Sequence, residues 1–428
     1  MKPQINVGMI GLGTVGVGTL RVLLENKAEI ERKIGSRLEV VRIVDLDTTS
    51  ERPVKFDKSI LTKNANEVLD NPDIDIVVEL IGGLHPAKDF ILRALKNGKH
   101  VVTANKELIA KEGTDILSLA DKQGLDFYFE ASVGGGIPVI GPLKECLAAN
   151  KIQEVIGIVN GTTNYILTKM ANQGSDFADV LKEAQKAGYA EADPTADVEG
   201  FDARYKLAIL AAIAFTNRID VNNIYCEGIT KISGNDIAYA REMGYALKLL
   251  AIAKRDGQEI QARVHPTLIP IAHPLANVND VYNGIFVRGD FVGDLMFYGR
   301  GAGSLPTGSA VAGDVIDIAR NINLDATGRL PCTCFENRRI QDMEEVETSY
   351  YIRMLVDDKP KVLANIASIF GEHNVSIATM VQKDHCKGRA EIVIVTHKIK
   401  EKNFRNAISL VEGLPVVSKV NNWIRVEE

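Results

Sequence analysis

The residues most able to do chemistry gather in the run GYAEADPTADVEGFDARYK, from Gly188 to Lys206. This run ends in two bases, Arg204 and Lys206, and the next nine residues, LAILAAIAF, carry no polar side chain. Charged groups at the edge of a dry core have shifted pKa values and often take part in catalysis. The carboxylates of the run are Glu191, Asp193, Asp197, Glu199 and Asp202.

Asp202 and Lys206 are four residues apart, so they share one face of a helix. A plain interpretation is an exposed ion pair worth about 0.3–0.5 kcal/mol. The all-apolar sequence that follows instead indicates a buried helix. Burial and the helix dipole favour the neutral amine of Lys206, while the neighbouring acids favour its ammonium. A lysine balanced in this way is suited to acid–base chemistry at the hydroxyl of a small substrate whose amino group the acids hold.

A glycine turn stands at the start of the chain. An apolar strand, Ile5–Ile10, runs into Gly11-Leu-Gly13-Thr14-Val15-Gly16, and an amphipathic helix, GTLRVLLENKAEIER, follows. Between a strand and a helix, this spacing is a dinucleotide fingerprint. Gly11 allows the tight turn, Gly13 lets the backbone approach a pyrophosphate, and Gly16 lets helix and strand pack closely. A purely structural glycine-rich turn is the alternative.

Strand and helix signals then alternate, which predicts a Rossmann-like, doubly wound α/β sheet of parallel strands. Such sheets bind ligands at the carboxyl ends of their strands. Asp45 stands at one such end and suits the adenosine ribose of NAD, although Arg42 and Arg52 leave NADP open. Thr103 and Lys106 stand at another, where Lys106 faces cofactor or substrate, or is an ordinary surface lysine. The predicted strands are Leu38–Val44, Ile74–Ile81, His100–Thr103 and Asp126–Glu130, and the predicted helices are Ala87–Asn97 and Thr114–Gln123.

Two further loops have polar or glycine-rich sequences. Three consecutive glycines follow Glu130 in the segment Ala131–Pro138. An oxygen-rich loop with one acid suits a hard cation of low charge, and a hinge between domains is the alternative. Asn160-Gly-Thr-Thr-Asn164 is expected to be a polar loop lining a pocket. Further on, a helix is predicted over Ala238–Arg255.

The glycine turn, the Asn160–Asn164 segment and the run AQKAGYAEADPTADVEGFDARYK from Ala184 resemble the homoserine dehydrogenase family. The match reads Ala184, Gly188, the Asp193-Pro194 pair and a D-x-x-G-x-D-x-x-x-K block ending at Lys206, and it extends over about residues 1–345. The resemblance implies NAD(P)-dependent interconversion of L-homoserine and L-aspartate 4-semialdehyde, in threonine, methionine and isoleucine biosynthesis.

The same resemblance implies roles for individual residues. Lys206 becomes the catalytic proton donor and acceptor, with Lys106 as a second active-site lysine. The implied substrate-binding residues are Glu191, Asp197, Asp202, Gly161 and Thr162. The implied cofactor-binding residues are Gly11, Gly13, Thr14, Val15, Gly16, Asp45, Thr103, Lys106 and Gly303. The implied sodium site is Glu130, Val133, Gly135 and Ile137, which favours the cation over the hinge.

The C-terminal part from Tyr350 has the order βαββαβ and resembles an ACT domain, the ligand-binding module of amino-acid enzymes. DDKPKVLANIASIFGEHNVSI carries this resemblance. The resemblance implies threonine feedback, with self-association as the alternative role. Lys361 departs from the pattern, because these modules often have a glycine there. The predicted domains are therefore a nucleotide-binding domain over 1–135, completed by a returning helix near 305–340, a substrate-binding and dimerisation domain over 136–304, and an ACT-like regulatory domain over 349–428.

Composition excludes several classes of protein. A formal charge of −6 without a basic run argues against nucleic-acid binding, and no apolar run is long enough to cross a membrane. An odd number of cysteines, five, indicates reduced cytoplasmic thiols. Cys332-Thr-Cys334 is a metal-ligand spacing without a second pair. A cytoplasmic homodimer or tetramer is expected.

Two other functions remain open from the sequence. One is an amino-acid sensor built on an inactive dehydrogenase fold, which the intact Lys206, Asp202 and glycine fingerprint argue against. The other is an aspartate-semialdehyde dehydrogenase, which needs an activated thiolate nucleophile. Cys146, the candidate for that thiolate, has no obvious activating partner in the sequence.

Overall fold

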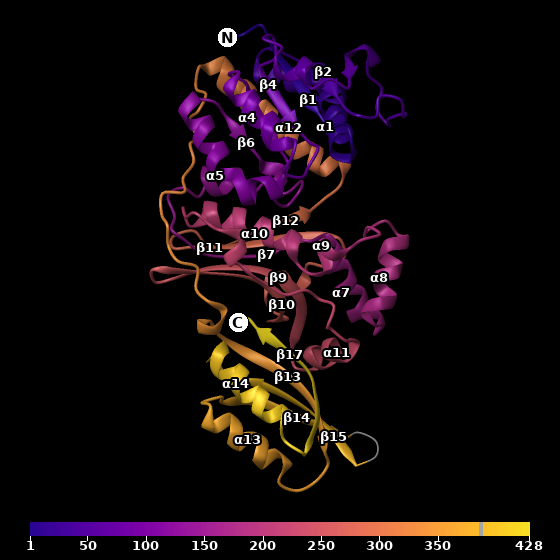
Figure 1. Ribbon diagram of the computed structural model, residues 1–428, viewed down its shortest axis with the longest axis vertical. Helices are drawn as coiled ribbons and strands as arrows, with labels where there is room; N and C mark the ends of the chain where they lie inside the picture. Colours follow the sequence, from indigo (N-terminus) through magenta and orange to yellow (C-terminus); the bar gives the residue numbers. More distant parts are fainter. Residues whose placement is uncertain (385–387) are drawn as a thin grey trace. The chain divides into compact units, whose positions relative to one another are not determined.

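The computed structural model describes residues 1–384 and 388–428 of the 428-residue chain. The chain divides into two compact units, each assembled from three stretches of sequence. The colours of Figure 1 follow the chain as it leaves and re-enters each unit. The first unit contains Met1–Val155, Tyr205–Asn223 and Asn283–Arg338, and the second contains Ile156–Arg204, Ile224–Tyr282 and Arg339–Glu428.

The first unit is built on a six-stranded sheet with the strand order β3-β2-β1-β4-β5-β6. All of its strand pairs are parallel. Parallel strands that helices cover on both faces have nearly continuous apolar sequences, as in IVVE of β4 and HVVT of β5, which are buried throughout. The predicted parallel α/β sheet is therefore confirmed. The strands are β1 Gln4–Ile10, β2 Arg37–Val44, β3 Leu61–Thr62, β4 Ile76–Glu79, β5 His100–Thr103 and β6 Phe127–Tyr128.

The helices of this unit differ from prediction at two points. The single helix expected after the glycine turn is two helices, α1 and α2, because Asn26 leaves helical geometry (φ −100°, ψ 13°) and ends the first of them. The helix expected from Thr114 begins earlier, at Lys106, because the Asn105 side chain accepts a hydrogen bond from the Leu108 N–H and caps it. The helices are α1 Thr14–Glu25, α2 Lys27–Ile34, α3 Asn66–Leu69, α4 Ala87–Lys96, α5 Lys106–Gln123, α6 Ile140–Lys144 and α12 Ser304–Leu324.

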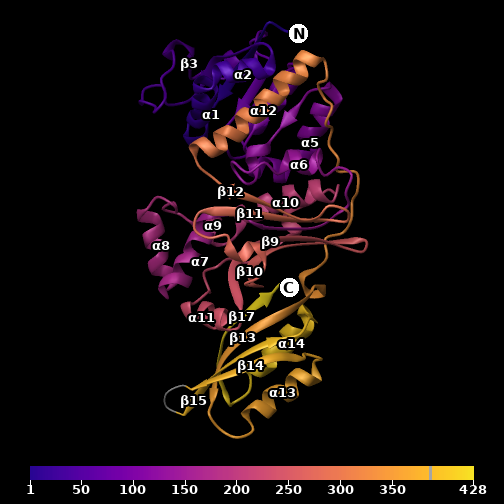
Figure 2. The ribbon, with the colours of Figure 1, turned by 180° about the vertical axis from the view of Figure 1, so that it is seen from behind.

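Helix α12 packs against α1 (Figure 2) although nearly 300 residues separate them in sequence. The approach is close enough to need glycine. A Cβ on Gly18 would lie 1.9 Å from the Ser304 carbonyl oxygen, and one on Gly308 would lie 2.5 Å from the Gly18 carbonyl carbon. Val311 and Val315 of α12 join the core formed by the first sheet and α1. The distant segment therefore completes the covering of the sheet.

Helix α10, Phe201–Ala214, confirms the buried helix predicted from LAILAAIAF. Leu207, Leu210, Ala211 and Phe215 are fully buried. An all-apolar sequence suits a helix that is buried over most of its surface. The two remaining strands of the first unit, β11 Tyr282–Gly289 and β12 Gly293–Arg300, lead directly to the loop before α12.

The second unit contains a long hairpin where the sequence predicted a helix. The expected helix Ala238–Arg255 is wrong, since α11 ends before Gly244 (φ +85°) and the next twelve residues form β9. β9 pairs along its whole length with β10, and this cross-strand burial outweighs the helix propensity of KLLAIAK. The elements of this part are α7 Gly161–Gln173, α8 Phe177–Lys186, α9 Thr195–Val198, β8 Tyr225–Cys226, α11 Gly234–Glu242, β9 Tyr245–Asp256 and β10 Glu259–Pro270, and β7 Ile152–Ile158 contains the division between the units.

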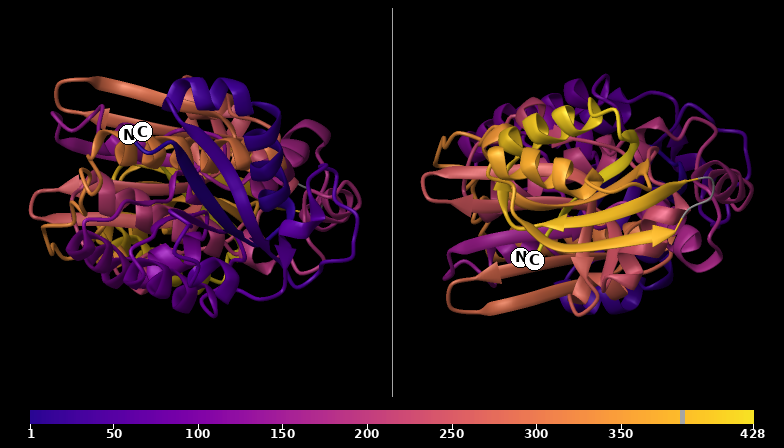
Figure 3. Two further views of the ribbon diagram at one scale, coloured as in Figure 1. Left: turned by 90° about the horizontal axis from the view of Figure 1, so that it is seen from above. Right: turned by 90° about the horizontal axis from the view of Figure 1, so that it is seen from below.

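The C-terminal part of the second unit has the predicted βαββαβ order. Its antiparallel strands follow the order β17-β13-β15-β14, and both helices lie on one face of them (Figure 3). Strand β17 also pairs in parallel with β10, so these strands continue the sheet of the β9–β10 hairpin. The elements are β13 Glu347–Asp357, α13 Val362–Glu372, β14 Ile377–Asp384, β15 Arg389–Thr396, β16 Ile399–Lys400, α14 Glu401–Glu412 and β17 Val417–Val426.

Candidate active site

The three glycines of the turn after β1 meet three different requirements. Gly11 has φ +104°, and a Cβ there would lie 2.8 Å from the Leu80 carbonyl group. A Cβ on Gly16 would lie 2.2 Å from the Gly11 oxygen, so α1 packs directly on the turn. Gly13 has nothing within 4 Å of its Cβ position and stands at the N-terminus of α1 without a side-chain cap. The turn therefore leaves room and backbone N–H groups for an anion.

Asp45 at the end of β2 is held by this turn. Its carboxylate accepts the Leu12 N–H at 2.6 Å through Oδ2 and the Asp47 N–H at 2.8 Å through Oδ1. The Arg52 guanidinium lies 3.6 Å from the same carboxylate. A fixed acid beside the glycine turn is the arrangement that binds a ribose hydroxyl in dinucleotide folds, and the neighbouring arginine adds a positive charge.

Thr103 and Lys106 lie where β5 ends and α5 begins. The Thr103 hydroxyl donates to Glu79, a fully buried carboxylate at the end of β4, at 2.6 Å. Glu79 also accepts the backbone N–H groups of Ile81 and Gly82. Glu79 was not predicted as a site residue, because an acid in an apolar strand belongs to no recognisable sequence motif. Lys106 is the first residue of α5 and is half-buried.

The loop before α12 reaches the glycine turn. Gly303 has φ +128° and stands at the N-terminus of α12, and the hydroxyl of the next residue, Ser304, donates to the Thr14 oxygen at 2.7 Å. The same loop packs on the triple-glycine segment, because a Cβ on Gly135 would lie 2.4 Å from the Gly301 oxygen. Two glycine loops far apart in sequence thus meet backbone to backbone.

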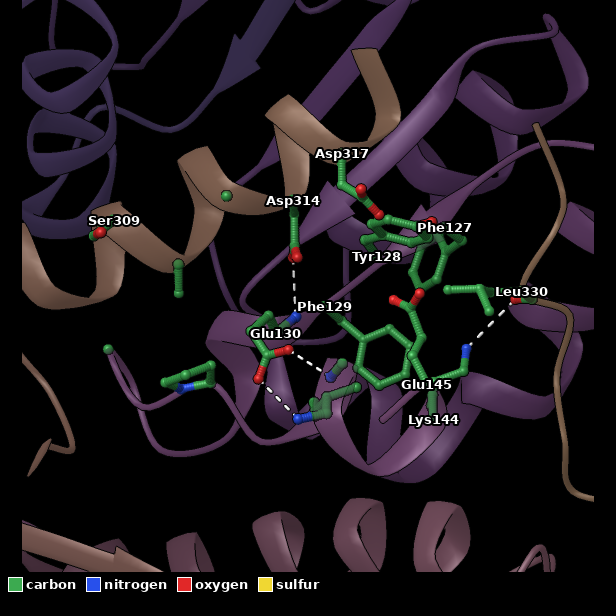
Figure 4. Close-up of a pocket in the computed structure, with 16 residues that line it drawn as sticks. Phe127, Tyr128, Phe129, Glu130, Lys144, Glu145, Ser309, Asp314, Asp317 and Leu330 are labelled. Atoms are coloured by element: carbon green, nitrogen blue, oxygen red, sulfur yellow. Dashed lines mark hydrogen bonds between the residues drawn. The ribbon is translucent and has the colours of Figure 1, made fainter. Parts of the chain in front are cut away.

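The carboxylate of Glu130 has a structural role. Oε1 accepts the N–H groups of Val139 and Ile140 at 2.6 and 2.8 Å, and Oε2 accepts that of Gly141 at 2.6 Å, so the side chain caps α6 (Figure 4). Its own N–H donates to Asp314, whose pKa is raised well above its usual range by burial and then by the Glu130 charge. Three N–H groups occupy three of the roughly four acceptor positions of this carboxylate, so capping α6 is its main role. The residues of the predicted sodium site also offer the main-chain oxygens of Glu130, Val133, Gly135 and Ile137.

In the second unit, Asn160 gathers two predicted site residues. Its Nδ2 group donates to Asp197 Oδ1 at 2.7 Å and to Asp202 Oδ2 at 2.9 Å. Its Oδ1 atom accepts the Thr163 N–H and caps α7. The polar loop expected at Asn160–Asn164 is therefore wrong, because all but the capping residue belong to the helix. An N-cap asparagine before a helix is a recognisable signal that could have revealed this.

The other predicted substrate-binding residues surround this group. Gly161 begins α7, and a Cβ there would lie 3.0 Å from the Val281 oxygen. The Thr162 hydroxyl donates to the Tyr189 oxygen at 2.7 Å. Glu191 is exposed, whereas Asp193 accepts hydrogen bonds from Thr195, which lower its pKa. Asp193 is thus used to start α9.

Asp202 and Lys206 lie on α10, four positions or about one helical turn apart. Both are buried, with exposed fractions of 6% and 8%. The helix therefore carries an acid and a base into a dry environment, directly after the glycine at position 200 (φ +83°) that turns the chain from α9.

Comparison with known proteins decides the family. A family model described as homoserine dehydrogenase matches residues 138–316, its NAD-binding domain matches 11–130, and an ACT domain matches 350–416. A curated homoserine dehydrogenase from Neisseria gonorrhoeae is 46% identical over 433 residues, covering 100% of this chain and 99% of the relative. The chain belongs to the homoserine dehydrogenase family.

Solved structures agree with this membership. A homoserine dehydrogenase from Thiobacillus denitrificans superposes with a TM-score of 0.92 at 46% identity, covering 99% of this chain and 98% of that one. A hyperthermophilic archaeal homoserine dehydrogenase mutant in complex with NADPH superposes with a TM-score of 0.63 at 26% identity, covering 75% and 98%. The protein is an oxidoreductase of amino-acid biosynthesis that acts on the CH–OH group of homoserine and uses NAD(P).

Among residues 1–384 and 388–428, no group of three or more His, Cys, Asp or Glu side chains could hold a metal ion. No helix in the same part of the chain is both long and apolar enough to cross a membrane. The His85 side chain is exposed, and its Nδ1 atom lies 3.0 Å from Asp89 Oδ2.

Proposed function

We propose that Lys206 is the acid–base residue of the homoserine dehydrogenase reaction. The observation that carries this role is its placement on α10, buried and one turn after Asp202, which Asn160 holds beside Asp197. A buried lysine amine can accept the hydroxyl proton of homoserine while a hydride leaves the same carbon, which converts the C–O single bond to a carbonyl. In the reverse direction Lys206 returns the proton to the aldehyde oxygen.

The substrate's charged ends have matching groups in the second unit. The carboxylates of Glu191, Asp197 and Asp202 hold the ammonium of homoserine. The amide of Asn160 positions two of them without neutralising their charge. The first N–H groups of α7, at Gly161 and Thr162, suit the substrate carboxylate, because a helix N-terminus attracts anions.

The nicotinamide cofactor fits the first unit. Open space at Gly13 and an uncapped α1 suit a pyrophosphate, and the fixed carboxylate of Asp45 suits a ribose. When bound, NAD(P) supplies the hydride acceptor. Lys106 and Thr103, at the carboxyl end of β5, orient the substrate side of this cofactor, and Gly303 closes the site beside Thr14. The implied cofactor-binding residues are Gly11, Gly13, Thr14, Val15, Gly16, Asp45, Thr103, Lys106 and Gly303.

The test of Lys206 separates catalysis from binding. Lys206→Ala should lose turnover by at least about 10³-fold, because no other group replaces the proton acceptor, while NADPH binding measured by fluorescence stays near that of the wild type. Lys182→Ala, a change at an exposed lysine of α8, is the matched control and should be active. A Lys206→Ala enzyme with near-normal turnover would overturn the assignment, and an inactive wild type would favour a sensor built on a dehydrogenase fold.

We propose that a sodium ion binds at the triple-glycine loop and that the main-chain oxygens of Glu130, Val133, Gly135 and Ile137 coordinate it. The Glu130 carboxylate is used to cap α6, so Glu130→Gln should leave any sodium dependence of activity in place. Replacing sodium by choline in the assay measures this dependence.

The C-terminal module is proposed to bind threonine and to reduce activity. Its support is the ACT-domain match. Lys361 argues against it, because this bulky charged residue stands at the N-cap of α13, in the left-handed region at φ 74°, where related modules often have a glycine. Steady-state rates with added threonine test the role, and unchanged rates at millimolar threonine would instead favour self-association.

We also infer a cytoplasmic homodimer or tetramer. The four cysteines in the described part of the chain are free, as expected in a reducing compartment. Sedimentation of the purified enzyme at several concentrations measures the oligomeric state.

A further inference from the structure

The homoserine dehydrogenase reaction uses neither Cys332 nor Cys334, yet the first unit holds these two thiols together. The Phe335 N–H donates to the Thr333 oxygen at 2.9 Å, which makes a tight turn centred on Cys334. The Cys332 N–H donates to the Asp121 carboxylate at 3.1 Å, so the start of this segment is tied to α5. A single residue separates the two cysteines, and both side chains are half-buried.

A half-buried lysine lies near this pair. Lys144 of α6 donates through Nζ to the Leu330 oxygen at 3.4 Å (Figure 4), and both residues line a pocket of about 380 Å³. Burial lowers the pKa of Lys144, while Cys332, Asp121 and Cys334 act in the opposite direction. The two thiols themselves do not line this pocket, and a small molecule reaches them through their half-exposed side chains.

The two thiols have different acidities. The neighbouring Cys334 side chain lowers the pKa of Cys332 to about 6 against the effect of burial, and the Lys144 charge contributes in the same direction. The Cys332 side chain, followed by burial, raises the pKa of Cys334 far above the ordinary range of a thiol. At neutral pH the pair therefore consists of one thiolate and one thiol, the combination needed for thiol–disulfide exchange.

The other described cysteines lack this arrangement. Cys226 donates to the Glu199 oxygen at 3.3 Å, and burial raises its pKa to about 11. Cys146 is exposed. These two residues are internal controls for reactivity.

We propose that Cys332 and Cys334 form a redox-modification site that low-molecular-weight disulfides oxidise to an intrachain disulfide. The Cys332 thiolate attacks one sulfur of the small disulfide, whose S–S bond breaks and releases one thiolate. Cys334 then gives up its proton and attacks the Cys332 sulfur, which expels the second half of the reagent. The chain loses two electrons to the small disulfide, which leaves as one thiol and one thiolate.

Oxidation of the pair would also change a contact with α10, the helix that carries Lys206. In the reduced chain, Cys334 Sγ lies 3.8 Å from the Ala212 oxygen of α10. A disulfide removes the S–H donor of this contact and also removes the thiolate charge that faces Lys144. The redox state of the turn is thereby connected to α6 and α10.

The test uses the full-length protein, oxidised glutathione at pH 7, an acid quench with N-ethylmaleimide, and peptide mass mapping. The wild type should pass through glutathione on Cys332 and end as a Cys332–Cys334 peptide two hydrogen atoms lighter. Cys334→Ser should retain glutathione on Cys332, and Cys332→Ser should leave Cys334 unmodified over the same time. Cys146→Ser, the matched control, should still form the disulfide.

Reactivity provides a second measurement. At pH 6, iodoacetamide should alkylate Cys332 about tenfold faster than Cys146, after allowance for the weaker nucleophilicity of a more acidic thiol. Lys144→Met should reduce this ratio. Stable glutathione on Cys332 in the wild type, initial attack at Cys334, or equal alkylation rates of Cys332 and Cys146 would each overturn the proposal.

Discussion

In the second unit, two groups of acids, most of them buried, are held in different ways. At the start of α7, the neutral amide of Asn160 holds the carboxylates of Asp197 and Asp202. In the C-terminal module, arginine side chains hold the acids. We call the second group the arginine network; it comprises Arg353 with Asp236 and Glu391, and Arg425 with Glu401 and Glu227.

Each acid of the arginine network accepts a hydrogen bond from a guanidinium group. Arg425 contacts Glu401 through two nitrogens at 2.7 Å and Glu227 through a third at 2.9 Å. Burial alone would lower the pKa of Arg425, but hydrogen bonds to Glu401 outweigh it and raise the pKa. A buried guanidinium that donates several hydrogen bonds to carboxylates leaves those carboxylates few free positions to bind a ligand.

The difference between the groups separates architecture from function. An amide fixes two carboxylates in place without adding a positive charge of its own. The arginine network fixes the C-terminal strands to α11 and the β8 region, and its acids are paired with guanidinium groups. The comparison predicts that changes in the first group reduce catalysis and that changes in the second reduce stability.

The largest effect is expected at Asn160. Asn160→Ala removes the donor shared by Asp197 and Asp202 and lets the two carboxylates repel each other, so kcat/KM should fall by about 10²–10³, equal to about 3–4 kcal/mol. Asn172→Ala, at an exposed position on the same helix, is the control. Steady-state kinetics with homoserine measures both, and equal activities would contradict the role given to Asn160.

A stability effect of similar size is expected at Arg425. Arg425→Met leaves Glu227 without its guanidinium and Glu401 with Arg405 as its only guanidinium among the described residues, and should lower the free energy of unfolding by about 3–5 kcal/mol. Arg389→Met, at an exposed position of β15, should change it little. Urea unfolding, followed by circular dichroism, measures the free energy of unfolding of both variants. An Arg425→Met enzyme as stable as the wild type would contradict the structural role of the arginine network.

His265, next to the arginine network, predicts a pH dependence of stability. Burial, followed by the charges of Arg425 and Arg263, holds the pKa of His265 well below 6.5. The unfolded chain therefore binds a proton below pH 6.5 that the folded chain does not. Stability from this residue is complete above pH 6.5 and falls by about 1.4 kcal/mol per pH unit below it. Urea unfolding at pH 5.5 and 7 should show a smaller difference for His265→Gln than for the wild type.

The smallest effect is expected at Lys361, which lies in the C-terminal module but outside the arginine network. Lys361→Gly relieves the left-handed backbone conformation at φ 74°, and the entropy of glycine offsets part of the gain. The net change should be a stabilisation of at most about 1 kcal/mol. A higher unfolding midpoint with unchanged turnover is expected, and a lower midpoint would contradict the strain at this residue.

The sequence predicted features whose signal is local. The turn at Gly11, the apolar helix before Phe215 and the order of the C-terminal elements all follow from short-range patterns, and the structure contains each of them. The resemblance to homoserine dehydrogenases, carried by the run ending at Lys206, was confirmed by the family match.

The features that the sequence did not predict depend on contacts between distant residues. The segment KLLAIAK has helix propensity, but pairing with β10 makes it a strand. The buried acid Glu79 is explained only by its partner Thr103 on the next strand. The grouping of Asn160 with two carboxylates is not visible in the sequence, because these partners lie about 40 residues further along the chain.

The most direct test of the comparison changes one acid of each group in parallel. Asp202→Asn and Glu391→Gln both remove a buried negative charge with little change in size, and kcat/KM and the unfolding midpoint are measured for each. Asp202→Asn should lose about 10²–10³ in kcat/KM and keep its midpoint. Glu391→Gln should keep its kcat/KM and lose about 2–4 kcal/mol of stability. The reverse pattern, with Asp202→Asn unstable and active and Glu391→Gln stable and inactive, would contradict the account.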